Sequence, residues 1–255
     1  MADTILVPFE LPDPEPISDV LVEDLAPLDV VAMGHFSVPE QTPTDAARDQ
    51  FGAEAQAELD EVAAPFRERS PSVRTRLVFG KTRETAINRV MLEEECAAEL
   101  DPAPTEGIGR ILVPIPDSAE FSLLPEFVQV LCEASTVEIT LFHVAEGSES
   151  TADGETILAD VREGLVAAGL DDDLVDTRIV EGDSHDEEIL AAAADYDAVV
   201  MYDAASRIRD RVFGSLPDRI AKGTGDPVIL VRRDYDPAAS DVPDASDASD
   251  DPSAT

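Results

Sequence analysis

A cationic segment stands between positions 206 and 222 of this chain. Its five basic side chains are Arg207, Arg209, Arg211, Arg219 and Lys222. Asp210 and Asp218 are the only carboxylates among them, although the whole chain has a formal net charge of −38. Arginines in such a setting indicate either a phosphate group held by charge-assisted hydrogen bonds or ion pairs with the chain's own carboxylates or a second subunit. Both interpretations stay open on the sequence.

The end of this segment predicts the N-terminus of a helix. Gly214 and Ser215 precede a helical pattern that we expect to reach about Lys222, with Gly223 and Gly225 ending it. A glycine just before a helix start leaves backbone N–H groups free to bind an anion. The sequence therefore predicts an anion site at Gly214 and Ser215.

The first half of the chain repeats in the second. TILVP at 4–8 returns as RILVP at 110–114, DVVAMGH at 29–35 as VEITLFH at 137–143, and TRLVFG at 75–80 as TRIVEG at 177–182. Segments that return in the same order predict two similar domains. In this alignment His35 and His143 occupy equivalent strand ends, where a structural role is the simpler interpretation than catalysis.

Each half alternates short apolar runs with helical patterns, which predicts parallel sheets covered by helices. The expected strands are 5–9, 30–33, 73–79, 98–100, 110–115, 137–144, 174–181, 197–202 and 228–231. The expected helices are 16–26, 45–69, 82–96, 119–134, 153–169, 184–194 and the one after Ser215. The first half has no counterpart of the last loop, helix and strand. We therefore expect an α/β fold of two Rossmann-like parallel-sheet domains, each with its own sheet.

The expected domain boundaries follow from these elements. Residues 1–107 form a domain truncated after its fourth strand, and residues 108–235 form a complete one. Residues 236–255 are low-complexity and acidic, which predicts a disordered tail.

The composition restricts the setting of the protein. The chain has 56 Asp and Glu against 18 Lys and Arg, and only two of the latter are lysines. This balance favours a cytosol of very high salt, where screening removes self-repulsion; the alternative is an acidic protein that binds basic partners. The electrostatic field of this negative charge repels nucleic acid and anionic membranes. Without a long apolar run or a signal peptide, we expect a soluble, cytoplasmic protein.

The other residues that could do chemistry do not form a recognisable catalytic or metal-binding motif. Cys96 and Cys132 form neither a disulfide framework nor a metal signature. The acidic run 183–186 suits a helix N-cap better than a metal site. No nucleophile motif accompanies the histidines, so we expect a binding protein.

Four segments resemble the universal stress protein family. They are ILVPIPDS at 111–118, HV at 143–144, EGDSHDEEIL at 181–190 and FGSLPDRIAKGTGDPVILVRR at 213–233. The resemblance implies a sheet of order 3-2-1-4-5, an adenine nucleotide such as ATP or AMP, a role in the stress response, and pairing through the last strand, within the chain or in a homodimer. The site residues that follow from the resemblance and from the cationic segment are Asp117, Val144, Arg207, Arg211, Gly214 and Ser215.

The chain departs from the pattern of the nucleotide-binding members of this family. Those members have glycines where this chain has Met201 and Ala204, and an aspartate where it has Pro116, with Asp117 one place later. Glu10 fills the aspartate position in the first half. Because glycines let backbone amides approach phosphates, the alternative is a scaffold or interaction protein that has lost its ATP site. A slow ATPase is a weaker third hypothesis, since no residue stands out that would activate water.

Overall fold

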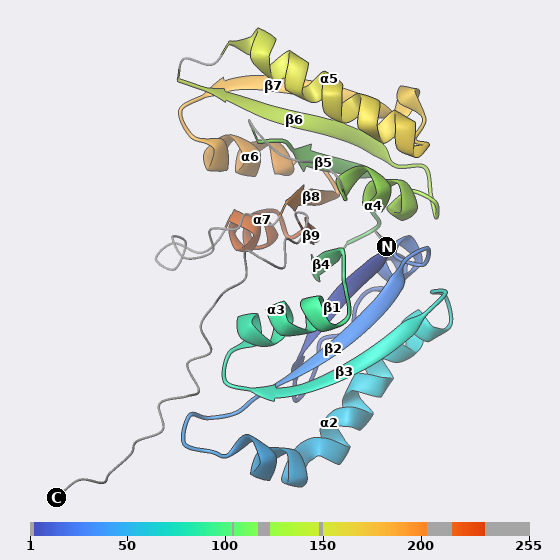
Figure 1. Cartoon of the computed structure of the whole chain (residues 1–255), viewed down its shortest axis with the longest axis vertical. Coiled ribbons are helices and arrows are strands. Elements are labelled where there is room, and N and C mark those ends of the chain that lie inside the picture. The colour runs from blue at the N-terminus through green and yellow to red at the C-terminus, as the bar shows by residue number, and fades with distance from the viewer. Residues whose placement is uncertain (1–2, 104, 117–122, 148–149, 203–215, 233–255) are drawn as a thin grey trace, which may run out of the picture.

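The computed structural model describes residues 3–103, 105–116, 123–147, 150–202 and 216–232 (Figure 1). Its strands are β1 (Thr4–Leu11), β2 (Asp29–Ser37), β3 (Val73–Gly80), β4 (Ala98–Asp101), β5 (Arg110–Pro114), β6 (Glu138–Glu146), β7 (Val175–Gly182), β8 (Ala198–Tyr202) and β9 (Val228–Val231). Its helices are α1 (Asp19–Asp24), α2 (Thr44–Arg67), α3 (Arg83–Glu93), α4 (Leu124–Leu131), α5 (Thr151–Ala168), α6 (His185–Ala193) and α7 (Leu216–Thr224), with a short 3-10 turn at Asp172–Leu174. The α/β class and the predicted strands are confirmed.

The strands form one mixed sheet of order β3-β2-β1-β4-β9-β8-β5-β6-β7. We call β1 to β4 with their helices the first unit, and β5 to β9 with theirs the second unit. Within each unit all strands are parallel, while β4 and β9 pair antiparallel and join the units. The expectation of a separate sheet for each domain is therefore wrong. β4 is the last strand of the first unit, and its outer edge pairs with β9 of the second unit.

The core differs between the two faces of this sheet. On the face covered by α1, α2, α4 and α5, one cluster of buried side chains runs across both units and includes Leu100 of β4 and Ile229 of β9. On the other face the core is divided: one cluster lies under α3, and another lies under α6 and α7. The two units are thus joined by a shared apolar core on one face only.

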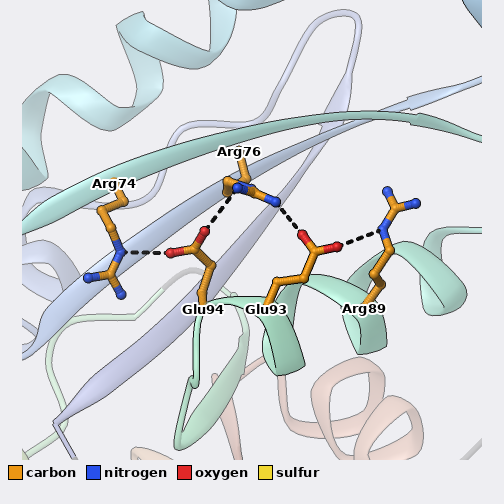
Figure 2. A network of polar contacts seen from close by, with 5 residues as sticks. All are labelled: Arg74, Arg76, Arg89, Glu93 and Glu94. Atoms are coloured by element: carbon orange, nitrogen blue, oxygen red, sulfur yellow. Dashed lines mark hydrogen bonds and ion pairs between the residues drawn. The ribbon is translucent and has the colours of Figure 1, made fainter.

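Five charged side chains attach α3 to the edge strand β3 (Figure 2). Glu94 lies 2.9 Å from Arg74 Nε and 3.1 Å from an Arg76 guanidinium nitrogen, and Glu93 pairs with Arg76 and, at 3.7 Å, with Arg89. Both strand arginines are about two-fifths exposed, whereas the Glu94 side chain is only 14% exposed. Glu94 is therefore the buried centre of this network.

The end of α7 differs from its prediction by two residues. The helix continues through Gly223 to Thr224, and Gly225, with a φ of 78°, ends it. A left-handed residue directly after a helix is the usual place for glycine. Gly223 instead packs closely: a Cβ there would lie 3.3 Å from Leu190 of α6.

Candidate functional site

The predicted anion site belongs to the carboxyl edge of the second unit. β8 ends at Tyr202 and α7 begins at Leu216, so the two described ends of this connection lie at the edge where ligands of open α/β sheets bind. The residues predicted to hold an anion lie outside the described residues: Arg207, Arg211, Gly214 and Ser215. Asp117, which follows β5, also lies outside them, as does the predicted acidic tail. These site residues stay predictions.

Val144 is the one predicted site residue within the described part. It lies in β6, its side chain is 1% exposed, and it packs in the core under α6 with Leu112, Phe142 and Ile189. The Val144 side chain therefore supports the sheet. Any contact between Val144 and a ligand would have to come from its main chain.

A polar pair stands beside this position, at the end of the same strand. Glu146 Oε1 lies 2.7 Å from His185 Nδ1 and accepts a 2.6 Å hydrogen bond from the His185 backbone N–H. His185 is the first residue of α6, and both side chains are between one third and two fifths exposed. Glu146 thus fixes the start of α6 and contributes negative charge to the rim.

The N-terminal regions of α6 and α7 are joined by an ion pair. Arg219 of α7 donates to Asp186 of α6 at 3.0 Å. Ser184 caps α6 by accepting from the Glu187 N–H, as the sequence predicted for this acidic run. Arg219 of the cationic segment is therefore used for a structural ion pair, as the alternative interpretation of that segment proposed.

The first unit has charged groups where the second has apolar ones. Glu10, in the position of Pro116, lies 2.7 Å from Arg83 Nε through one oxygen and 3.4 Å from His35 Nδ1 through the other. Arg83 is the first residue of α3, so Glu10 connects the end of β1 to the start of this helix. The place where a ligand would approach β1 is occupied by this ion pair.

The predicted equivalence of His35 and His143 is wrong. Strand pairing matches Ile5 with Val30 in the first unit and Ile111 with Ile139 in the second, so Val144, and not His143, corresponds to His35. The sequence alignment of the two histidines is off by one residue. Because side chains alternate along a strand, this shift places the histidines on opposite faces of the sheet.

The environments of the two histidines differ accordingly. His143 is fully buried, its Nδ1 lies 2.8 Å from the Ile115 carbonyl oxygen, and Gly154 of α5 packs against its ring. A Cβ at Gly154 would lie 2.7 Å from His143 Cδ2, so this approach requires glycine. His35 is 2% exposed, and its Nε2 is buried without a hydrogen-bond partner. Both rings are too buried to reach a substrate in this conformation.

Metal and thiol chemistry find no support in the described residues. Within that part of the chain no three His, Cys, Asp or Glu side chains are grouped to hold a metal ion. Burial raises the pKa of both the Cys96 and the Cys132 thiol to about 12, which keeps them protonated. The sequence predicts the helix start at 183–186 but not its contact with Glu146. Nothing in the sequence connects Glu146 with the start of α6.

The comparisons with known proteins agree with this geometry. Residues 107–232 match the universal stress protein family. This match covers the second unit and begins in the linker before β5. No curated protein sequence matches the chain.

Solved structures extend the likeness to both units. A universal stress protein from Archaeoglobus fulgidus aligns with 91% of this chain and 97% of its own, at 16% identity and a TM-score of 0.63. A candidate universal stress protein from Pseudomonas aeruginosa aligns with 91% and 94%, at 13% identity and a TM-score of 0.55. These likenesses show the fold, which confirms the Rossmann-like arrangement.

A third structure is described as a universal stress protein in complex with cAMP. It aligns with 50% of this chain and 98% of its own, at 21% identity and a TM-score of 0.41, too low to carry a ligand over to this chain. In the described ranges, no helix combines the length and apolar character that crossing a bilayer requires.

Proposed function

We propose that this chain is a regulatory module of the stress response that binds one adenine nucleotide, ATP or AMP, at the second unit. The observation that carries the proposal is the carboxyl edge of that unit. There β8 ends and α7 begins, on either side of the segment with Arg207, Arg211 and Gly214. Helix N-termini and arginine side chains both bind phosphate favourably.

The described rim supports a single site per chain. In the first unit, Glu10 at the end of β1 pairs with Arg83 at the start of α3, and the residue at the same place in the second unit is Pro116. The first unit also ends at β4 and has no counterpart of α7. We therefore assign the nucleotide to the second unit alone, and no catalytic step to either.

The second candidate is a scaffold whose nucleotide site is lost. It is favoured by two basic side chains of the described rim that already face carboxylates: His185 faces Glu146 and Arg219 faces Asp186. Met201 and Ala204, in place of two glycines, favour it as well. Under this hypothesis the arginines of the cationic segment make ion pairs only.

Calorimetric titration with ATP in multimolar KCl distinguishes the two. We expect binding to the wild-type chain and loss of the heat signal in the double variant Arg207→Ala with Arg211→Ala. Arg162→Ala is the matched control, because it removes an exposed arginine that pairs with Asp172 at 2.8 Å in another part of the second unit. No binding by the wild type would leave the scaffold hypothesis. Equal affinity in the wild type and the double variant would show that Arg207 and Arg211 do not hold the nucleotide.

We also propose that the protein works in a cytosol of high salt. Its net charge of −38 destabilises the folded chain through self-repulsion, and about 1 M salt shortens the range of this repulsion to about 3 Å. Unfolding by urea at increasing KCl concentration should show a steadily rising free energy of unfolding. A flat or falling dependence would contradict the proposal.

A further inference from the structure

The nine-stranded sheet has two outer edges, β3 in the first unit and β7 in the second (Figure 1). Both strands are eight residues long, and in the described part of the chain each is paired on one side only. The strand registers make Val73 of β3 equivalent to Val175 of β7. An edge strand presents unpaired backbone N–H and C=O groups, and its side chains decide whether a second strand can pair with it.

The two edge strands differ in the charges that they carry. β3 has Arg74 and Arg76, and both form ion pairs with α3 (Figure 2). At the equivalent positions β7 has Asp176 and Arg178, which are exposed and form no ion pair with another described residue. The guanidinium carbon of Arg178 lies 5.6 Å from the centre of the Phe142 ring, so this side chain rests on the sheet. β7 therefore has one charge of each sign on the same face of its edge.

The sequence of β7 is self-complementary about Thr177. When two copies of β7 pair antiparallel with Thr177 opposite Thr177, each Asp176 lies opposite Arg178 of the other copy. On the other face of the sheet, the apolar Val175 lies opposite Ile179, so no apolar residue faces a charge. Opposite charges and pairs of threonines that face each other across two strands stabilise an antiparallel sheet. The edge of β7 thus fits a second copy of itself.

Other pairings of the two edges are less favourable. Two β3 strands in the same arrangement would place Arg74 opposite Arg76 twice, and β3 against β7 would give one attractive and one repulsive pair. Moving the axis of the β7 pair to Asp176 or to Arg178 would place that residue opposite its own copy. Because like charges directly opposite each other destabilise a sheet, the charges select one partner strand and one register.

We propose that the edge of β7 is an interface between two copies of this chain, which pair antiparallel about a two-fold axis at Thr177 and continue one sheet across both copies. The axis uses the same edge in each copy, so the assembly closes as a dimer. Beyond the five paired residues, the exposed Asp173 and Glu181 of the two copies come opposite each other. High salt weakens this repulsion more than it weakens charge pairs in direct contact, so the dimer should need high salt.

Sedimentation of the full chain in multimolar KCl tests the charge pairs. We expect a dimer of the wild type, and Asp176→Arg or Arg178→Asp alone should raise its dissociation constant by about tenfold or more, because each places like charges opposite each other twice. An equimolar mixture of the two variants restores both opposite-charge pairs and should dimerise. Glu61→Arg makes the same change of charge as Asp176→Arg at an exposed residue of α2, and should stay a dimer. A monomeric wild type, or a mixture that dimerises no better than either variant alone, would overturn the proposal.

A disulfide at the axis tests the register. Thr177 is exposed and lies opposite its own copy in the proposed dimer, where Cα atoms are about 4.5–5.5 Å apart and a disulfide can form. After mild oxidation Thr177→Cys should give disulfide-linked dimers, whereas Thr75→Cys, at the equivalent position of β3, should give few. The wild type is the blank, because burial raises the pKa of its two natural thiols to about 12. Equal cross-linking of the two variants, or none of Thr177→Cys, would overturn the proposal.

Discussion

The carboxyl edges of the two units differ in the strand at which a charged pair stands. In the first unit Glu10, at the end of β1, faces both Arg83 and His35. In the second unit the residue at this place is Pro116, and a similar pair, Glu146 with His185, stands at the next strand, β6. The described carboxylate of this edge thus lies at the central strand in the first unit and at the neighbouring strand in the second.

A second difference concerns the helix that the first unit lacks. In the second unit Leu190 of α6 packs against Gly223 of α7. The corresponding residue of α3 is Asn88, because Ile87 and Ile189 align. The position that contacts α7 in the second unit thus has a polar residue in the first unit. The ion pairs of Figure 2 hold α3 to β3 in its place.

The largest expected effect comes from the core that the units share. Phe66 of α2 and Phe127 of α4 are both fully buried in it, one in each unit. Phe66→Ala and Phe127→Ala should each lower the free energy of unfolding by about 3–5 kcal/mol, because each leaves a cavity. Urea unfolding followed by circular dichroism should show one transition in both variants.

The control for these truncations is Val166→Ala, at a position 38% exposed, which should change stability by less than about 0.5 kcal/mol. Two separate transitions, with Phe66→Ala moving only one of them, would show that the units fold independently.

The buried cysteine of each unit should make the free energy of unfolding fall by a similar amount at alkaline pH. Burial is the main cause that raises the pKa of Cys96 and of Cys132 from 9.0 to about 12, so the folded chain keeps protons that the unfolded chain releases. Their stabilising effect is complete below about pH 9 and is lost as the pH rises from about 9 to 12, at about 1.4 kcal/mol per pH unit for each thiol.

Urea unfolding at a series of alkaline pH values measures this loss. Cys96→Ala and Cys132→Ala should each remove about half of the pH dependence assigned to the thiols. An unchanged pH dependence in either variant would show that its thiol does not differ between the folded and unfolded states.

Substitution by leucine should change the stability of the chain differently at the two buried histidines. His143→Leu loses the hydrogen bond to Ile115 and crowds Gly154, and should cost about 1–3 kcal/mol. His35→Leu removes the buried Nε2, which has no hydrogen-bond partner, together with the 3.4 Å contact of Nδ1 with Glu10, and should change stability by less than about 1 kcal/mol. Thermal unfolding compares them, and a larger loss for His35→Leu would refute this comparison.

The smallest expected effect is that of the ion pairs between α3 and β3. Glu94→Gln should destabilise the chain by about 1 kcal/mol, since Glu94 is the least exposed member and faces two arginines. Glu93→Gln, at a side chain 44% exposed, is the control and should cost less than about 0.5 kcal/mol. Urea unfolding at two salt concentrations measures both, and equal costs would contradict the assigned importance of Glu94.

The order of the elements could be predicted because short apolar runs mark the strands and helical periodicity marks the helices along the chain. Val228–Val231 is a strand in prediction and structure alike, and Val73–Gly80 differs from its prediction by one residue. The pairing of β4 with β9 could not be predicted, since no local signal in either strand specifies an antiparallel partner more than a hundred residues away.

The candidate site was predictable only in part. Val144 was found through its neighbour His143, but aligning the two histidines by residue type hid the one-residue shift that strand pairing reveals. Glu146 and His185 were not predicted as a pair, because their contact depends on the start of α6 reaching the end of β6. Contacts between elements are set by tertiary packing, which residue spacing does not report.

The central claim is that only the second unit binds a nucleotide. Equilibrium dialysis of the full chain against labelled ATP in multimolar KCl counts the sites directly. We expect one ATP bound for each chain at saturation. Two ATP molecules for each chain would contradict the assignment of the site to the second unit alone, and none would contradict nucleotide binding by this chain.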